Sequence, residues 1–178
     1  GPLVKASLNV GRHSLLAAHQ YGVALKLALA EHHISARQLI FELGADLAAQ
    51  LPGEASVFVA EARLLGSGIV LDRFTDQSPA LLRTIGPDFV KIRYDLLCHE
   101  YGLANGLAMG DGLAGIASRT GYAVIVAGIE EDGKITPSVH NHFYLQGNGL
   151  CPPEPLDQWQ PDGTAEPETE TASGDECA

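Results

Sequence analysis

The sequence predicts an α/β protein built around a parallel sheet. Residues 68–93 have the pattern of strand, helix and strand, because two short apolar runs flank a segment in which Pro79 suits a first helical turn. Residues 122–127 form an unbroken apolar run, which is typical of a strand buried on both faces. Hydrophobic residues make up 46% of the chain and aromatic residues only 6%, a composition that favours an aliphatic α/β protein over an all-β one.

Six predicted strands alternate with helices along the chain. Hydrophobic periodicity places the strands at residues 4–10, 38–43, 69–72, 89–92, 122–127 and 142–146. The same periodicity places helices at residues 11–31, 45–51, 55–65, 78–86, 94–107 and 111–118. Asp111 is the expected cap of the last helix, Pro52-Gly53 is an expected turn, and residues 57–59 also fit a strand. A break is expected near Gly102 or Gly106.

Two charged residues lie at the ends of the neighbouring strands predicted at residues 69–72 and 89–92. Asp72 follows the apolar run 69–71, and Lys91 follows the next strand. The strand ends of a parallel sheet share one rim, where α/β folds build sites, so we expect Asp72 and Lys91 to lie side by side. One interpretation of the two residues is a structural ion pair, and the other is an active centre.

The negative charge of the chain is concentrated in its C-terminal part. The formal net charge is −11, and residues 154–178 hold eight acidic residues and no Lys or Arg. We therefore expect one folded domain over residues 3–153 and a disordered acidic tail over residues 154–178. Because the chain has no basic surface, nucleic acid is not an expected partner.

The remaining bulk features predict a cytoplasmic location. Cys98, Cys151 and Cys177 are too few and too scattered for a disulfide framework, so free thiols in a reducing compartment are expected. No apolar run has the length of a membrane span, and no signal peptide opens the chain. Gly1-Pro2 has the form of a protease-cleavage scar, so we expect the natural polypeptide to continue upstream.

Six short segments resemble the motifs of EAL domains, in the order of that family. Residues 71–74 (LDRF) and 91–93 (KIR) are similar to its DDFG and KID motifs. The other four segments resemble the remaining motif strands and are residues 7–10 (SLNV), 41–45 (FELGA), 126–130 (VAGIE) and 146–148 (QGN). EAL domains are bacterial phosphodiesterases, and inactive relatives of them, that act on or sense cyclic di-GMP.

The resemblance implies an incomplete (β/α)8 barrel of the TIM type, with about six β/α units. The similarity begins at the family's third strand, and the strand that carries the EAL signature is not in this sequence. An open six-stranded sheet exposes an edge and one apolar face. Another segment, a partner or a second copy must cover them, so a protein partner or self-association is expected.

The resemblance also implies a damaged metal site. Three positions keep the family's metal ligands, namely Asn9, Glu42 and Asp72. Four positions where the family has functional acids carry other residues, namely Ala45, Arg73, Arg93 and Ala127. Lys91 and Gln146 match residues of the family's active centre. We therefore expect no catalysis and no cofactor, with Mg²⁺ or Mn²⁺ bound only if the vestigial site still holds an ion.

Three functions follow from the resemblance. The expected one is an inactive regulatory domain in cyclic di-GMP signalling that acts as a protein-interaction or dimerisation module. The alternative is a non-hydrolysing cyclic di-GMP receptor, whose ligand would contact Arg73, Lys91 and Gln146. Arg73 has a second interpretation, which we favour, as a cation that neutralises neighbouring acids. The third function is a residual metal-dependent phosphodiesterase.

Overall fold

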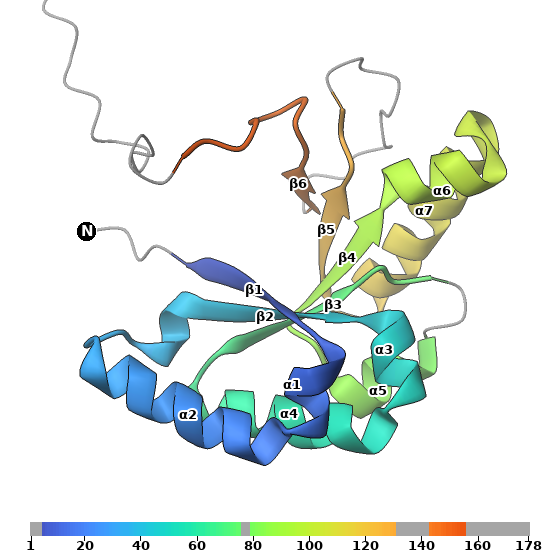
Figure 1. The fold of residues 1–178 in the computed structure, drawn as a ribbon. Helices are drawn as coiled ribbons and strands as arrows, with labels where there is room; N and C mark the ends of the chain where they lie inside the picture. The colour runs from blue at the N-terminus through green and yellow to red at the C-terminus, as the bar shows by residue number, and fades with distance from the viewer. Residues whose placement is uncertain (1–4, 76–78, 131–142, 156–178) are drawn as a thin grey trace, which may run out of the picture.

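The structure is a computed structural model, and it describes residues 5–75, 79–130 and 143–155. Its centre is one six-stranded sheet in the order β1-β2-β3-β4-β5-β6, as Figure 1 shows, and every neighbouring pair is parallel. The strands are β1 (Ala6–Val10), β2 (Leu39–Gly44), β3 (Gly68–Asp72), β4 (Phe89–Arg93), β5 (Ala123–Ala127) and β6 (Phe143–Gln146). The predicted parallel α/β sheet is therefore confirmed.

Helices connect the consecutive strands from β1 to β5. They are α1 (Arg12–Leu16), α2 (Ala18–Glu31), the 3-10 helix η1 (Ala36–Gln38), α3 (Ala45–Gln50), α4 (Pro52–Leu65), α5 (Pro79–Ile85), α6 (Tyr94–Tyr101) and α7 (Leu103–Arg119). Figure 1 shows α2 and α4 below β1 and β2, with α6 and α7 beside β4 and β5. No helix of the described residues is long and apolar enough to cross a membrane.

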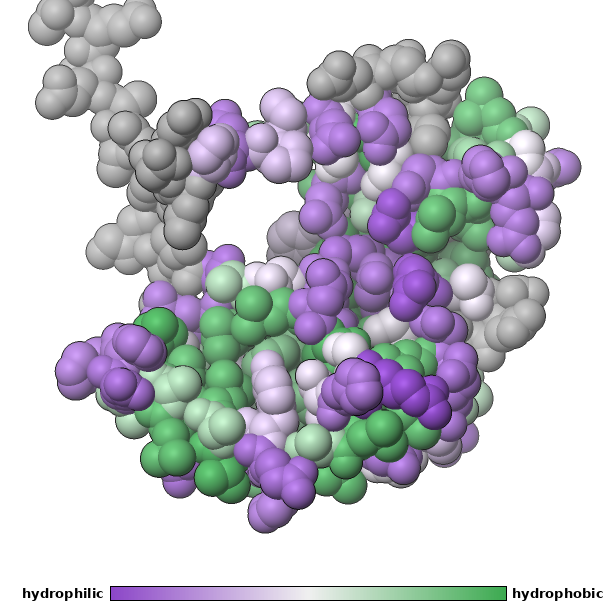
Figure 2. Space-filling view, in the orientation of Figure 1, coloured by the Kyte–Doolittle hydropathy of each residue, from purple (hydrophilic) through white to green (hydrophobic). Residues whose placement is uncertain are grey.

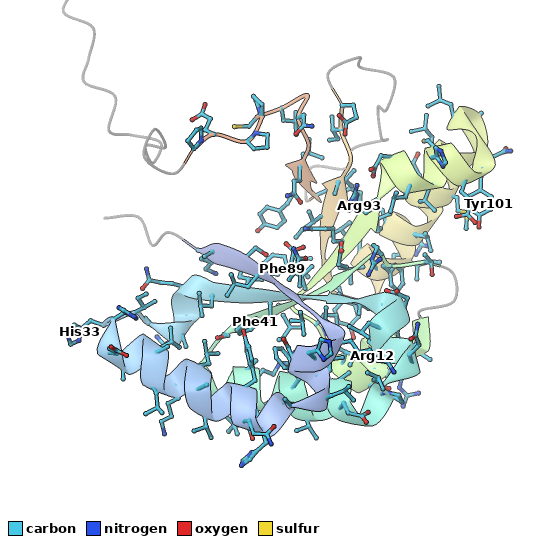
Figure 3. The ribbon with its side chains drawn as sticks, viewed as in Figure 1. Arg12, His33, Phe41, Phe89, Arg93 and Tyr101 are labelled. Atoms are coloured by element: carbon cyan, nitrogen blue, oxygen red, sulfur yellow. The ribbon has the colours of Figure 1, made fainter. Side chains whose placement is uncertain are left out.

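The two faces of the sheet are packed differently. Phe41 points toward the helices, where its ring lies 6.3 Å from that of Tyr21 and 5.4 Å from that of Phe58. Phe89 lies on the other side of the sheet, as Figure 3 shows, with its ring 5.7 Å from that of Tyr144. Tyr144 remains 59% exposed. The core therefore lies between the sheet and the helices, while the opposite face is only partly covered.

The sheet has the arrangement of six consecutive units of a (β/α)8 barrel, with an opening between β1 and β6 (Figure 1). Among the described strands, β1 pairs only with β2, and β6 pairs only with β5. The predicted incomplete barrel is therefore confirmed. The acidic tail beyond residue 155 lies outside the described residues, so its disorder and the domain boundaries stay predictions. Cys98 and Cys151 are free, and Cys177 lies outside the described part.

The predicted single helix over residues 11–31 is wrong, because the chain breaks at Ala17. The backbone of Ala17 has φ −110° and ψ 29°, which ends α1 before α2 begins. Leu15 is buried beside this break and Leu16 is exposed. No glycine or proline marks the break, so sequence patterns had no signal for it.

Two further local predictions are wrong. Pro52 does not form a free turn but begins α4, where its missing N–H costs no hydrogen bond. Asp111 caps no helix, because α7 already begins after Gly102, which has φ +81°. Asp111 lies within α7 and accepts a hydrogen bond of 2.8 Å from the Tyr94 hydroxyl. The expected break near Gly102 is confirmed.

Candidate functional site

The carboxyl ends of the strands form a cleft of about 330 Å³ on the open face of the sheet. Seven of the residues singled out in the sequence line this cleft, namely Asn9, Glu42, Asp72, Lys91, Arg93, Ala127 and Gln146. Parallel pairing brings them together, because Asn9 is in register with Glu42 and Ala127 with Gln146. The expected clustering of these residues at one rim is observed.

Glu42 is held by two neighbours at the centre of the cleft. The Lys91 ammonium donates to Glu42 Oε2 over 2.6 Å, and the Ser7 hydroxyl donates to Glu42 Oε1 over 2.5 Å. The Lys91 side chain is 8% exposed and that of Glu42 is 14% exposed, so water contributes little here. Both carboxylate oxygens of Glu42 are therefore engaged by the chain's own donors.

The ion pair between Lys91 and Asp72 that we expected from their neighbouring strands is not formed. Lys91 reaches instead to Glu42, whose side chain is one methylene longer than that of Asp72 and faces the same side of the sheet. The order of the strands predicts which residues are neighbours. It does not predict which of two nearby carboxylates forms an ion pair with a flexible lysine. Ser7, which the sequence analysis did not identify as a site residue, lies two residues before Asn9 and so shares its face of β1.

Asp72 lies in the same cleft with one oxygen unsatisfied. Its Oδ1 atom is buried and has no hydrogen-bond partner among the described residues. Burial raises the pKa of Asp72 above its ordinary value, and the nearby charge of Lys91 opposes this rise without cancelling it. The neutral carboxyl is therefore favoured here more than at the surface.

Arg73 points away from the cleft. Its backbone has φ +55°, and its guanidinium lies 2.9 Å from Asp46 Oδ1 and 3.9 Å from Asp72 Oδ2. Gly44 makes this reach possible, because a Cβ atom there would lie 2.4 Å from Arg73 Nη2. Arg73 lines a neighbouring pocket of about 370 Å³ between α3 and α6. It thus contacts two acids, which is the geometry that the neutralising interpretation requires.

Arg93 also has a carboxylate partner. Its guanidinium forms a two-pronged pair with Asp95, in which Nε donates to Oδ1 over 2.8 Å and Nη2 donates to Oδ2. Although burial raises the pKa of Asp95, the hydrogen bond from Arg93 lowers it below its ordinary value overall. Asp95 packs against Gly128, where φ is +85° and a Cβ atom would lie 2.1 Å from Asp95 Oδ1. Figure 3 shows Arg93 near the end of β4.

The cleft has little free positive charge for an anionic ligand. Lys91 and Arg93 line it, and each is already paired with a carboxylate. Glu42, Asp72 and Glu130 line it as well, so acidic side chains outnumber the two cations among its described lining residues. Charge balance therefore disfavours the binding of a phosphate-rich molecule unless an existing pair opens.

A family model and solved structures identify the fold of this chain. The model of the EAL domain matches residues 1–153. This chain belongs to the EAL domain family. No curated protein matches it.

Several solved EAL domains have the same fold as this EAL domain. The EAL domain of FimX from Xanthomonas citri, in complex with c-diGMP, is 16% identical with a TM-score of 0.71, and the match covers 88% of this chain and 63% of that one. The PaMucR phosphodiesterase in its c-di-GMP complex is 19% identical with a TM-score of 0.74, covering 86% and 63%. LapD from Vibrio cholerae, bound to c-di-GMP, is 18% identical with a TM-score of 0.57, covering 71% and 31%.

The chain thus spans less than two thirds of the length of these structures. At such low identity the likeness establishes the fold alone.

A pair of catalytic metal ions does not fit the residues present. Across residues 5–75, 79–130 and 143–155, no group of three or more His, Cys, Asp or Glu side chains is arranged to hold a metal. Both oxygens of Glu42 are taken by Lys91 and Ser7, and Arg73 stands beside Asp72. An ion at Glu42 would have to displace a buried ammonium.

Proposed function

We propose that this EAL domain does not hydrolyse cyclic di-GMP and serves cyclic di-GMP signalling as a regulatory module that contacts other proteins. The observation that carries the proposal is the engagement of Glu42 by Lys91 and Ser7. Glu42 is one of only three residues that match the family's metal ligands. A carboxylate that already neutralises a buried lysine is a poor ligand for a divalent cation.

Two replacements support the absence of hydrolysis. Arg73 places a guanidinium 3.9 Å from Asp72, so a metal ion at Asp72 would meet a like charge. Ala127 lines the cleft without offering a carboxylate. A two-metal mechanism needs two ions that clamp the attacking and leaving oxygens of the phosphate. The replacements at positions 73 and 127 remove two of the acids that the resemblance places beside these ions.

The open sheet supports a role in protein contact. β1 and β6 each pair with a single described strand, and unpaired strand edges are common sites for adding another polypeptide. Tyr144, Leu145 and Leu150 are each more than 40% exposed near β6. A cytoplasmic location for this role remains a prediction.

The experiment that tests the proposal is a hydrolysis assay with the full chain. Cyclic di-GMP is incubated with Mn²⁺ or Mg²⁺, and the linear dinucleotide is separated by chromatography. We expect none above the level without protein, while the PaMucR phosphodiesterase run in parallel serves as the positive control. Metal-dependent product that disappears in the Asp72→Asn variant would show an intact active centre and overturn the proposal.

A second candidate function is a cyclic di-GMP receptor. The cleft is polar and open, with Lys91, Arg93 and Gln146 along its wall. The FimX, PaMucR and LapD structures hold this dinucleotide. Titration calorimetry of the full chain without metal separates the two functions. Saturable heat that is lost in Lys91→Met, in a variant that circular dichroism shows to be folded, favours the receptor, whereas no heat at high micromolar ligand favours the contact module.

A further inference from the structure

A second pocket lies beside the strand-end cleft, between α3, α6 and the residues that directly follow β3. Its volume of about 370 Å³ falls within the range of roughly 300–1,000 Å³ that is usual for small-molecule sites. Arg93 is the one described lining residue that it shares with the cleft, so the two hollows are separate. Figure 2 shows hydrophilic and hydrophobic residues side by side on the surface where Figure 1 places α3 and α6.

Much of the pocket wall is apolar. Phe74 and Leu97 line it from the buried side. Ala45 and Ala49 lie four residues apart on the same face of α3, and their short side chains leave the space open. Leu96 lines the pocket from α6 and is 45% exposed. Such a wall favours a ligand with an apolar body, because binding would remove apolar surface from water on both sides.

Arg73 brings a guanidinium to this pocket. The group lies 2.9 Å from Asp46 Oδ1 through one nitrogen, and its distance of 3.9 Å from Asp72 Oδ2 is too long for a hydrogen bond. Arg93, in contrast, holds Asp95 with two parallel hydrogen bonds. A guanidinium is suited to such two-pronged binding of a planar carboxylate. Among the ion pairs of the described residues, Arg73 has no partner of this kind.

The local backbone fixes the position of the Arg73 guanidinium. Arg73 has φ +55°, a conformation that residues with a Cβ atom rarely adopt. Phe74 follows it, and its amide donates to the Lys91 carbonyl over 3.0 Å, which holds the turn. Gly44 leaves the space that the guanidinium occupies. An ion pair as exposed as that of Arg73 with Asp46 adds little to stability, so folding alone gives little reason for this placement.

The charges around the pocket limit the kind of anion that it can take. Arg73 and Arg93 are balanced by Asp46 and Glu100 among the described lining residues, so a molecule with several negative charges is not favoured. A single carboxylate can share Arg73 with Asp46. The Asp46 side chain is 59% exposed, and water can therefore solvate it when a ligand approaches.

We infer that this pocket binds a small organic monocarboxylate, whose apolar body lies between α3 and α6 and whose acid group is held by Arg73. This binding site goes beyond the proposed function and does not depend on it. It would give the domain a small-molecule ligand at a place separate from the strand-end cleft.

Titration calorimetry of the full chain with two probes of equal size tests the inference. The first probe is 1-naphthoate, which combines a flat apolar body with a carboxylate, and the second is the neutral 1-naphthamide. We expect saturable binding of 1-naphthoate and binding of the amide that is weaker by about tenfold or more, because only the acid forms a charge-assisted pair with Arg73.

Three variants locate the probe. Arg73→Met should reduce the affinity for 1-naphthoate to that for the amide. Ala49→Phe fills the pocket from the exposed side of α3 and should weaken both probes by about tenfold or more. The matched control is Arg83→Met on α5, an exposed arginine outside the pocket, which should bind both probes as the parent does. Circular dichroism checks that all three variants are folded.

Absence of saturable binding of 1-naphthoate at millimolar concentration overturns the inference. Equal affinity of the parent for the two probes overturns it as well, because Arg73 then holds no carboxylate. Binding that Ala49→Phe leaves unchanged would place the probe elsewhere and has the same consequence. Failure of the proposed function has a separate signature, since hydrolysis of cyclic di-GMP would remove that function and leave the binding of 1-naphthoate as it is.

Discussion

The strand-end cleft and the outer face of α2 depart from the usual burial of side chains in opposite directions. Lys91 is 6% exposed in the cleft, whereas Leu27 is 67% exposed on α2. The buried charge is tolerated because Glu42 neutralises it at 2.6 Å. The exposed leucine makes no comparable contact among the described residues. Removing one charge of the cleft pair is therefore expected to destabilise the chain far more than shortening a side chain on the outer face of α2.

The largest effect on stability is expected when one partner of the buried pair is removed. Lys91→Ala leaves the Glu42 carboxylate largely buried with Ser7 as its remaining donor, which lowers the free energy of unfolding by about 3–5 kcal/mol. Urea denaturation measures this change. The control is the double variant Lys91→Met with Glu42→Leu, which removes both charges and should recover most of the loss. A single variant within about 1 kcal/mol of the parent would mean that water already solvates the pair.

The contact between α6 and α7 is closely packed. A substitution there gives a reference value for the stability changes expected in the cleft and on α2. A Cβ atom at Gly106 would lie 2.5 Å from backbone atoms of Cys98, so Gly106→Ala must separate the two helices. We expect a loss of about 1–3 kcal/mol in the free energy of unfolding. Gly112→Ala is the matched control in the same helix, because nothing lies within 4 Å of its added Cβ. The control should gain up to about 1 kcal/mol from helix propensity.

The pH dependence of stability tests the electrostatics of the cleft at Asp72. Because burial raises its pKa in the folded state, folding favours the protonated carboxyl. The stabilising contribution of Asp72 is thus complete below its ordinary pKa of 3.8 and is lost as the pH rises through the raised value. Asp72→Asn should therefore be more stable than the parent at neutral pH, with an advantage that shrinks toward pH 3. Lower stability of Asp72→Asn at neutral pH would show that the ionised form is the favoured one.

The smallest effect on folding is expected on α2. Leu27 is 67% exposed, so Leu27→Ala should change the free energy of unfolding by less than about 0.5 kcal/mol in urea denaturation. A large loss would place Leu27 in the core of the chain.

The sheet and the clustering of polar residues at its carboxyl edge could be predicted, because both follow from short apolar runs in the sequence. Apolar runs ending in Asp72, Lys91 and Gln146 determine which side chains reach the carboxyl ends of parallel strands. The break at Ala17 was not predictable, since no glycine or proline marks it.

Which charged side chains form ion pairs within the site could not be predicted from the sequence either. Lys91 pairs with Glu42 and not with Asp72, and the Arg73 guanidinium contacts Asp46. These choices depend on side-chain reach and on the space that Gly44 leaves, which appear only when three strands and α3 are assembled. The outer face of α2 illustrates the converse case, because Val23 and Leu27 are visible in the sequence but only their exposure distinguishes them from core residues.

The measurement that tests the central claim most directly is a Mn²⁺ titration of the full chain, followed by the electron paramagnetic resonance signal of the free ion. With Glu42 held by Lys91 and Ser7, we predict that the signal rises with each addition as it does in buffer alone. Lys91→Met, in which Glu42 is released, serves as the comparison and should take up the ion. Saturable uptake of two ions by the unaltered chain would contradict the account.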